Sequence, residues 1–552
     1  MAEIQIINIG TVANDFTGDT LRAGMDKVND NFTNFKVEGT NFTGSLLVGH
    51  NVTGALSSAE KNTGVGIGAL DALTSGDSNV AVGYNTGTSL QSGNQNILIG
   101  GQAGDALISG GQNIAIGHNA LGNEDGHGRN VAVGHSALEN LNAGSQGYNI
   151  AVGYLSGQSL STGIQNVLIG GFAGDTMNTG ARNVGIGYEA LEAETVRGRA
   201  VAIGYRALKA QTGASADTYN VAVGYDAGHN ITTGINNVLL GGLAGDGLTT
   251  GSDNAVLGFA ALSNPNAGNR SIAIGSSALN AQNAGSAGQN MYNIGVGYNA
   301  GGSISTGTLN TIVGSLAGDA LTTGSENIAI GYAALSSEDG HGKNIAIGVN
   351  ALEDLDAGAD AYNIAIGHDT GRNISTGIKN TIIGGLAGDA ITTSGNNVAI
   401  GYESLTTETG GSNSVAIGYF TLRDQNVGTG SAYNVAVGYN SGEKTTTGVK
   451  NTLIGAFSGD ALTTGMRSVA IGYEALTKET GSDRSVAVGT DALRNQNLGS
   501  GNSYNTAVGD SAGEEITTGD LNTLIGGLVG DALNTGNENT AIGYAALTSE
   551  TK

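Results

Sequence analysis

The sequence contains no cysteine, no tryptophan and only one proline among its 552 residues. Without cysteine there is no disulfide framework and no thiolate metal site, and the redox compartment stays open. Basic residues are scarce, 22 against 47 acidic ones, which gives a formal net charge of −25. Such a surface repels phosphate backbones and anionic membranes, which argues against nucleic-acid binding. The sequence contains no run of about 18 apolar residues, so we expect no membrane span. Residues 1–5 do not resemble a secretory signal.

Glycine is abundant, with 96 residues that follow no Gly-X-Y period, which excludes collagen. The many Val and Ile residues argue against disorder. A short apolar phrase closed by glycine, NVAVG at 79–83, recurs along the chain. Its glycine falls at 49, 66, 83, 100, 117 and 134, in steps of 17 residues. The next step is longer, and from there every fourth step exceeds 17 by two to five residues. The repeat is therefore a block of four phrases, with 29 phrases between positions 49 and 543.

A phrase of four or five strand-forming residues followed by Gly, Asn, Thr and Ser predicts one strand and a return within 17 residues. That length fits one coil of a parallel β-solenoid, or β-roll, and is too short for a propeller blade. We therefore predict an all-β chain with a β-solenoid shaft over residues 41–552, built from 29 coils in four-coil blocks.

The strands are apolar on both faces. In 80–82 the β-branched Val80 and Val82 point one way and Ala81 points the other. We predict that the β-branched pair lies inside the coil and that the middle residue points outward to identical chains, most simply as a homotrimer. A flattened coil with both sides packed inward is the alternative. The predicted oligomer interface comprises Ala81, Leu98, Leu168, Leu239, Ile312, Ile382, Leu453 and Leu524.

Residues 1–40 differ from the repeats. Gly18-Asp19-Thr20 offers a helix start, and apolar residues then recur at spacings of three and four. This seam predicts a short α-helix that packs on its own domain or on a second copy. The seam residues are Leu21, Met25, Val28, Phe32 and Phe35.

The opening residues INIGTVAND at 7–15, TGDTLR at 17–22 and KVNDNF at 27–32 resemble an N-terminal segment of virion structural proteins of tailed bacteriophages. The resemblance implies a virion-attachment module. SVAIG, at 414–418 and 468–472, resembles the head repeat of trimeric autotransporter adhesins, whose heads are trimeric β-rolls. The same repeat occurs in phage fibre proteins, and the opening segment favours that context.

Several recurrent side chains could carry binding chemistry. From the second block onward a tyrosine precedes the first strand of each block and either contacts glycans or packs over the coil: Tyr148, Tyr219, Tyr292, Tyr362, Tyr433 and Tyr504. An aspartate in each second coil either caps a turn, which we favour, or binds calcium: Asp105, Asp175, Asp246, Asp319, Asp389, Asp460 and Asp531. The asparagine that opens most strands predicts a hydrogen-bonded ladder.

No catalytic set stands out from the repeats, so we expect neither enzyme activity nor a cofactor. The histidines His118, His127, His135 and His341 lack metal-ligand spacing, and we expect no metal. The favoured hypothesis is a phage tail, neck or head fibre located on the virion, held by its N-terminus to other virion proteins and able to adhere to host glycans. A secreted or cell-surface trimeric adhesin is the main alternative. An ice-binding solenoid and a glycan depolymerase are weaker ones.

Overall fold

The computed structural model describes residues 35–39, 42–48, 57–196, 198–212, 217–286 and 288–549. The chain divides into two compact units, the first ending at Ala260 and the second beginning at Ala261. In the described ranges every regular element is a strand, and none of these residues forms a helix that could cross a membrane. The chain is therefore all-β over the part that the structure describes.

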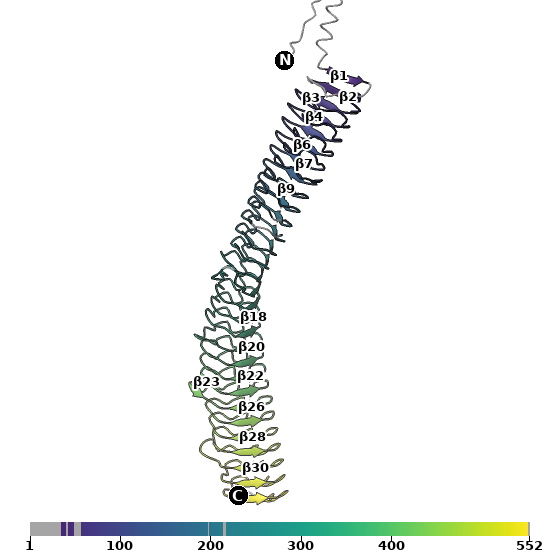
Figure 1. Cartoon of the computed structure of the whole chain (residues 1–552). Helices are drawn as coiled ribbons and strands as arrows, with labels where there is room; N and C mark the ends of the chain where they lie inside the picture. The colour runs from purple at the N-terminus through teal and green to yellow at the C-terminus, as the bar shows by residue number, and fades with distance from the viewer. Residues whose placement is uncertain are drawn as a thin grey trace, which may run out of the picture. The chain divides into compact units, whose positions relative to one another are not determined.

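The first unit opens with an antiparallel pair, β1 (Phe35–Gly39) and β2 (Phe42–Val48), and β2 then pairs in parallel with the first three-residue strand. Each later strand pairs in parallel with the one before it (Figure 1). The strands are β3 (Thr63–Val65), β4 (Val80–Val82), β5 (Ile97–Ile99), β6 (Ile114–Ile116), β7 (Val131–Val133), β8 (Ile150–Val152), β9 (Val167–Ile169), β10 (Val184–Ile186), β11 (Val201–Ile203), β12 (Val221–Val223), β13 (Val238–Leu240) and β14 (Ala255–Leu257).

The second unit repeats the same parallel ladder. Two additional two-residue strands, β23 (Gly411–Ser412) and β25 (Gly430–Ser431), pair with each other away from the main ladder (Figure 1). The ladder strands are β15 (Ile272–Ile274), β16 (Ile294–Val296), β17 (Thr311–Val313), β18 (Ile328–Ile330), β19 (Ile345–Ile347), β20 (Ile364–Ile366), β21 (Thr381–Ile383), β22 (Val398–Ile400), β24 (Val415–Ile417), β26 (Val435–Val437), β27 (Thr452–Ile454), β28 (Val469–Ile471), β29 (Val486–Val488), β30 (Thr506–Val508), β31 (Thr523–Ile525) and β32 (Thr540–Ile542).

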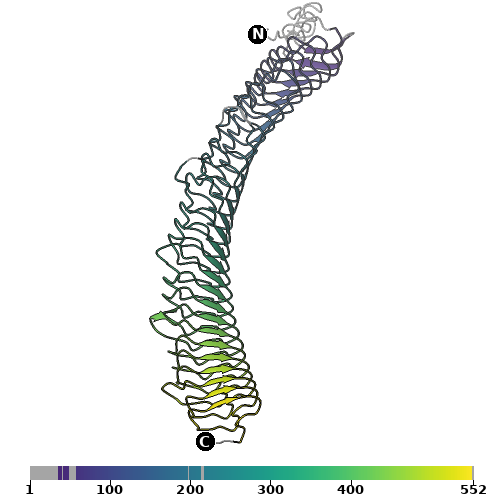
Figure 2. The same ribbon diagram turned by 60° about the horizontal axis from the view of Figure 1, so that its bottom comes forward.

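These ladders confirm the predicted parallel β-solenoid of about 17-residue coils, with about 28 coils from β3 onward. Equivalent residues of successive coils lie side by side, as in Val80↔Ile97, Ala81↔Leu98 and Val82↔Ile99. Figure 2 shows the strands of each unit gathered along one side of the coils, with looped segments along the other. We number positions within a coil from the strand-closing glycine, which is position 0, so that Val82 is −1 and Tyr84 is +1 of the coil of Gly83.

The strand-closing glycine is required by the stacking of the coils. At Gly117 the φ angle is +141°, in a region that side chains disfavour. A Cβ atom built there would lie 2.2 Å from the carbonyl oxygen of Gly134 in the next coil. Any side chain at position 0 would therefore push neighbouring coils apart, which explains why glycine recurs at this position.

The asparagine at position −4 forms the predicted ladder. The side-chain Oδ1 of Asn62 accepts from the backbone N–H of Asn79 at 2.9 Å and from its Nδ2 at 3.1 Å. Asn79 Nδ2 also donates to the carbonyl of Gly93 at 2.9 Å, and Asn79 is fully buried. Because each amide meets both neighbours inside the coil, the polar group is satisfied without water. The ladder prediction is confirmed.

The orientation predicted for the strands is wrong. The middle residues assigned to an oligomer interface point into their own coil and are at most 1% exposed: Ala81, Leu98, Leu168, Leu239, Ile312, Ile382, Leu453 and Leu524. The β-branched neighbours, such as Ile97 and Ile99, point outward and are 39% and 37% exposed. These middle residues have almost no surface to offer to another chain.

The physical reason is crowding inside the narrow coil. Third and fourth coils place a buried leucine at +4, such as Leu121, and keep alanine at the strand centre, as at Ala115. Second coils do the reverse: Leu98 fills the centre and Gly104 stands at +4, where a Cβ would lie 2.9 Å from Leu98 Cδ2. In most second, third and fourth coils the interior therefore holds one large side chain across these two positions, which leaves little room for two further β-branched residues per strand.

The N-terminal helix prediction falls mostly on residues that the structure does not describe. Leu21, Met25, Val28 and Phe32 lie outside the described ranges. Phe35, the last predicted seam residue, begins β1 and is a strand residue. The prediction of helix is therefore wrong at Phe35, because this residue enters an antiparallel pairing with Val48 of β2.

Candidate functional site

The strongest candidate surface is the outward face of the strand ladder. Positions −3 and −1 carry Val, Ile, Leu or Thr in nearly every coil and remain partly exposed in both units. In β13 the pair Val238 and Leu240 is 50% and 45% exposed. A ladder of this length that presents apolar side chains to water on every coil is unusual for a monomer, and such patches mark contact surfaces.

An aromatic column borders this face at position +1. In the first unit His118, His135 and Tyr154 follow one another with ring centroids 5.3 and 5.4 Å apart. In the second unit Tyr402 and Tyr419 stack at 5.5 Å, and the stack continues to Tyr439. The spacing is close to the repeat of stacked coils, so within these runs each ring packs on the ring of the next coil while its edge stays in water.

On the opposite border, position −5 carries the six tyrosines that sequence analysis singled out, each 46–55% exposed. Five of them pair with the cation one coil earlier, which lies over the ring and donates to the hydroxyl. For Arg270 and Tyr292 the donor distance is 2.8 Å, and for Lys343 and Tyr362 it is 3.2 Å. The other pairs are Arg129–Tyr148, Arg199–Tyr219 and Arg484–Tyr504. The sixth, Tyr433, has Asn413 at the cation's position.

Acidic side chains follow the aromatic column at +2 and +5. The second-coil aspartates lie at +5 and are half-buried, and burial is the main cause that raises the pKa of Asp105, Asp175, Asp246, Asp319, Asp389 and Asp460 above the ordinary value. For Asp175 burial and the charge of Glu192 raise the pKa to about 6. The backbone N–H groups of Asp105 and Ala106 act in the opposite direction and lower the pKa of Asp105, as expected for a carboxylate beside its own turn. Asp531 occupies the equivalent position.

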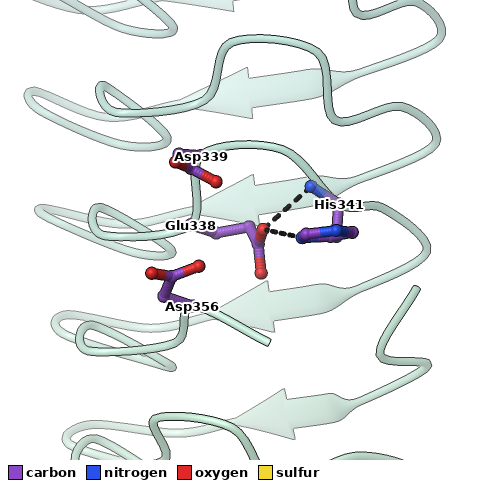
Figure 3. A group of neighbouring side chains, drawn as sticks. All are labelled: Glu338, Asp339, His341 and Asp356. Carbon is purple, nitrogen blue, oxygen red and sulfur yellow. Dashed lines mark hydrogen bonds and ion pairs between the residues drawn. The ribbon is translucent and has the colours of Figure 1, made fainter. Parts of the chain in front are cut away.

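A second candidate site is a pair of carboxylate–imidazole turns in third coils. Glu338 is fully buried; its Oε1 accepts from the backbone N–H of His341 at 2.9 Å and its Oε2 from that of Ala357 at 3.3 Å. The His341 Nδ1 lies 3.3 Å from Oε1. Asp339 and Asp356 stand on either side of this pair (Figure 3). The turn of Glu124 and His127 repeats the same contacts.

Ligand-type atoms of Glu338, Asp339, His341 and Asp356 all lie within 4.8 Å of one another, as do those of Glu124, Asp125 and His127. Carboxylates with imidazole are ligands that several divalent transition metals accept. In this turn the buried carboxylate already accepts two or more backbone N–H groups. The described hydrogen bonds therefore satisfy Glu338 without a cation.

Three other third coils bury the same glutamate against a glutamine. Gln425 Nε2 donates to Glu408 Oε2 at 3.0 Å, and Gln496 Nε2 donates to Glu479 Oε2 at 3.0 Å. Glu194 and Gln211 form the third pair, at 2.7 Å. Burial alone would raise the pKa of Glu479, but hydrogen bonds from Ser482 and Gln496 outweigh it and hold that pKa below the ordinary value. These glutamates also bind backbone N–H groups of the block's inserted loop, as at Val427 and Leu498.

Searches against protein families and against curated proteins found no match to this chain.

The structure thus brings the predicted tyrosines to one border of the outward face and the predicted aspartates to the other. Sequence reasoning missed the buried glutamates, although their recurrence seven residues after the strand-closing glycine in third coils was visible. It also missed the stacked column at +1, whose signal is the tyrosine that directly follows so many of these glycines.

Proposed function

We propose that this chain is a structural fibre protein of a tailed bacteriophage, in its tail, neck or head region. The observation that supports the proposal most is the outward apolar face, repeated coil after coil in both units. A solenoid in which nearly every coil presents Val or Ile to water fits a scaffold made from several parallel copies, and three copies are proposed here. The interface then consists of positions −3 and −1 instead of the buried middle residues.

In this proposal residues 1–40 attach the fibre to other virion proteins, as their resemblance to phage segments implies. The paired tyrosines at −5 are candidates for contact with host-surface glycans, since each retains an exposed ring edge. No enzymatic step, cofactor or metal is part of the proposal. A trimeric adhesin on a cell surface is the alternative, and the SVAIG phrase at 414–418 supports it equally.

Two measurements test the proposal. Light scattering of the full chain should give a mass near three times 54.8 kDa, and a stable monomer would contradict the multi-chain scaffold. Immunogold electron microscopy with antibodies to the shaft should label appendages of tailed phage particles. Labelling of a bacterial surface instead would support the adhesin.

A further inference from the structure

The positively charged residues of this acidic chain are concentrated at one position of the coil. Of its 22 lysines and arginines, ten stand at position −5, on the border of the outward face. They are Lys61, Arg129, Arg182, Arg199, Arg270, Lys343, Lys379, Lys450, Arg467 and Arg484. Only three acidic residues share that position: Asp253, Glu326 and Glu538. We call this border the cationic column.

The opposite border has the reverse charge. Positions +2 and +5 hold 19 acidic residues and five basic ones, and we call this border the acidic band. At +2 they are Glu189, Asp226, Asp369, Glu403, Glu474 and Asp491. At +5 they are Asp71, Asp105, Glu139, Asp175, Glu192, Asp246, Asp319, Glu353, Asp389, Glu443, Asp460, Glu514 and Asp531. The five basic residues at these positions form ion pairs with acids of the same band: Arg206, Lys209, Arg372, Arg423 and Arg494. The other acidic residues give the band its excess of negative charge.

The two borders are too far apart to neutralise each other in one chain. Seven residue steps separate −5 from +2, roughly 20 Å at about 3.3 Å per extended residue. Exposed charges at that distance are screened at physiological salt, where the Debye length is about 8 Å. Among the residues described here, Lys379, Lys450 and Arg467 form no ion pair with their own chain and remain exposed.

We propose that the cationic column of one copy lies against the acidic band of the next, which makes an ionic seam between parallel, in-register copies. This inference rests on the multi-chain scaffold proposed above. When copies are related by rotation about an axis parallel to the coil axis, one border of each copy necessarily meets the other border of its neighbour. A two-fold axis perpendicular to the coils would bring like borders together, and the charges would repel.

The pattern within single coils favours copies that lie in register. Eight of the ten coils with a cation at −5 have an acidic residue at their own +2 or +5, for example Lys450 with Asp460 and Arg467 with Glu474. The three coils with an acid at −5 have none at +2 or +5. Opposite charges at −5 and at +2 or +5 of one coil attract each other when the same coil of a second copy lies alongside.

The face is large enough for this assembly. Each coil contributes roughly 4.8 Å of height by about 20 Å of width, on the order of 100 Å². Each unit has at least a dozen coils, which gives roughly 1,200 Å² for one unit of one copy, above the approximately 800 Å² per partner of a standard interface. Apolar residues at −3 and −1 supply the buried area, and the seam supplies direction and register.

The test compares charge reversals that change the net charge equally. In the full chain, K450E/R467E reverses two seam cations, and K444E/K478E reverses two exposed lysines at +6, outside the cationic column. Sedimentation at low salt should show a dissociation constant at least about tenfold higher for K450E/R467E than for wild type. The difference should shrink in high salt, and K444E/K478E should assemble at least as tightly as wild type, because these lysines adjoin the acidic band, as Lys444 does Asp460. Equal effects of the two variants would overturn the seam.

A swap within one coil tests the register. R467E/E474K restores opposite charges in an in-register seam and should assemble more tightly than R467E alone. Because Glu474 also pairs with Arg494, thermal unfolding of each variant is compared first, and E474Q serves if E474K does not fold. Failure of the swap to restore assembly in a folded protein would overturn the register.

A monomeric wild type would instead overturn the multi-chain scaffold itself. If K450E/R467E loses binding to an acidic polysaccharide such as heparin but assembles normally, the column is a ligand site and the seam is refuted.

Discussion

The two faces of each ladder strand place neighbouring residues in opposite surroundings. In β5, Leu98 points into the coil and has no exposed surface, whereas Ile97 and Ile99 on either side are more than a third exposed. The interior accepts polar groups only when they are paired, as with the asparagine ladder and the buried glutamates. The outward face instead accumulates stacked rings and ion pairs that each contribute little. Stability of one coil thus depends mainly on the inside, and the outside is the surface that remains open to other molecules.

The largest expected effect comes from truncating the inward side chain. Leu98→Ala should lower the local free energy of unfolding by about 2–5 kcal/mol, since the gap lies between coils that cannot close up. Ile97→Ala, at the neighbouring outward position, should cost about 1 kcal/mol or less and should weaken assembly instead. Amide hydrogen exchange around β5 measures the first effect and sedimentation the second. Equal losses of exchange protection in the two variants would contradict the assignment of faces.

The second expected effect concerns the paired polar groups inside the coil. Gln496→Leu removes the side-chain donor to the buried Glu479 and should cost about 1–3 kcal/mol. The chain itself places leucine there in another block, at Leu355, where a histidine accompanies the glutamate. Adding Ser482→His to Gln496→Leu should therefore recover part of the loss. Denaturant unfolding of both variants provides the comparison, and no recovery would mean that the histidine does not compensate for the glutamine.

The sequence repeat alone predicts much of the fold. The 17-residue period, the parallel ladder and the asparagine pairing follow from positions 0 and −4 alone. Strand orientation does not, because Val-Ala-Val is apolar on both faces and its pattern cannot say which face is inside. The decisive signal was reciprocal size: leucine or isoleucine at the strand centre of second coils occurs with glycine at +4, whereas in third and fourth coils a mostly alanine centre occurs with leucine at +4. The burial of the glutamates could not be predicted either. A carboxylate is expected at the surface unless the groups that hydrogen-bond to it are known.

The third expected effect lies at the boundary between the two faces, at the half-buried Asp175. Its pKa in the folded chain is about 6, above the value of 3.8 for an ordinary aspartate. The folded state therefore holds this proton more tightly, and the resulting stabilisation is present below about pH 4 and lost as the pH rises through about 6. Asp175→Asn should remove that dependence and, after allowance for solvent screening, should be about 1 kcal/mol more stable relative to wild type at pH 7 than at pH 4. Thermal unfolding across this range measures it, and a constant difference would contradict the assigned shift.

The smallest expected effect belongs to the outward tyrosine pairs, for which the chain provides its own control. Arg484 lies over Tyr504 with 5.3 Å between its guanidinium carbon and the ring centroid, whereas Asn413 stands at the cation's position for Tyr433. Arg484→Ala should cost about 0.5 kcal/mol, and Asn413→Arg should gain a similar amount, because exposed cation–π contacts are weak. A double-mutant cycle with Tyr504→Phe, measured at one protein concentration, separates the hydroxyl bond from the ring contact. A coupling well above 1 kcal/mol would mean that these pairs are shielded from water, as they would be if a neighbouring copy covered this border.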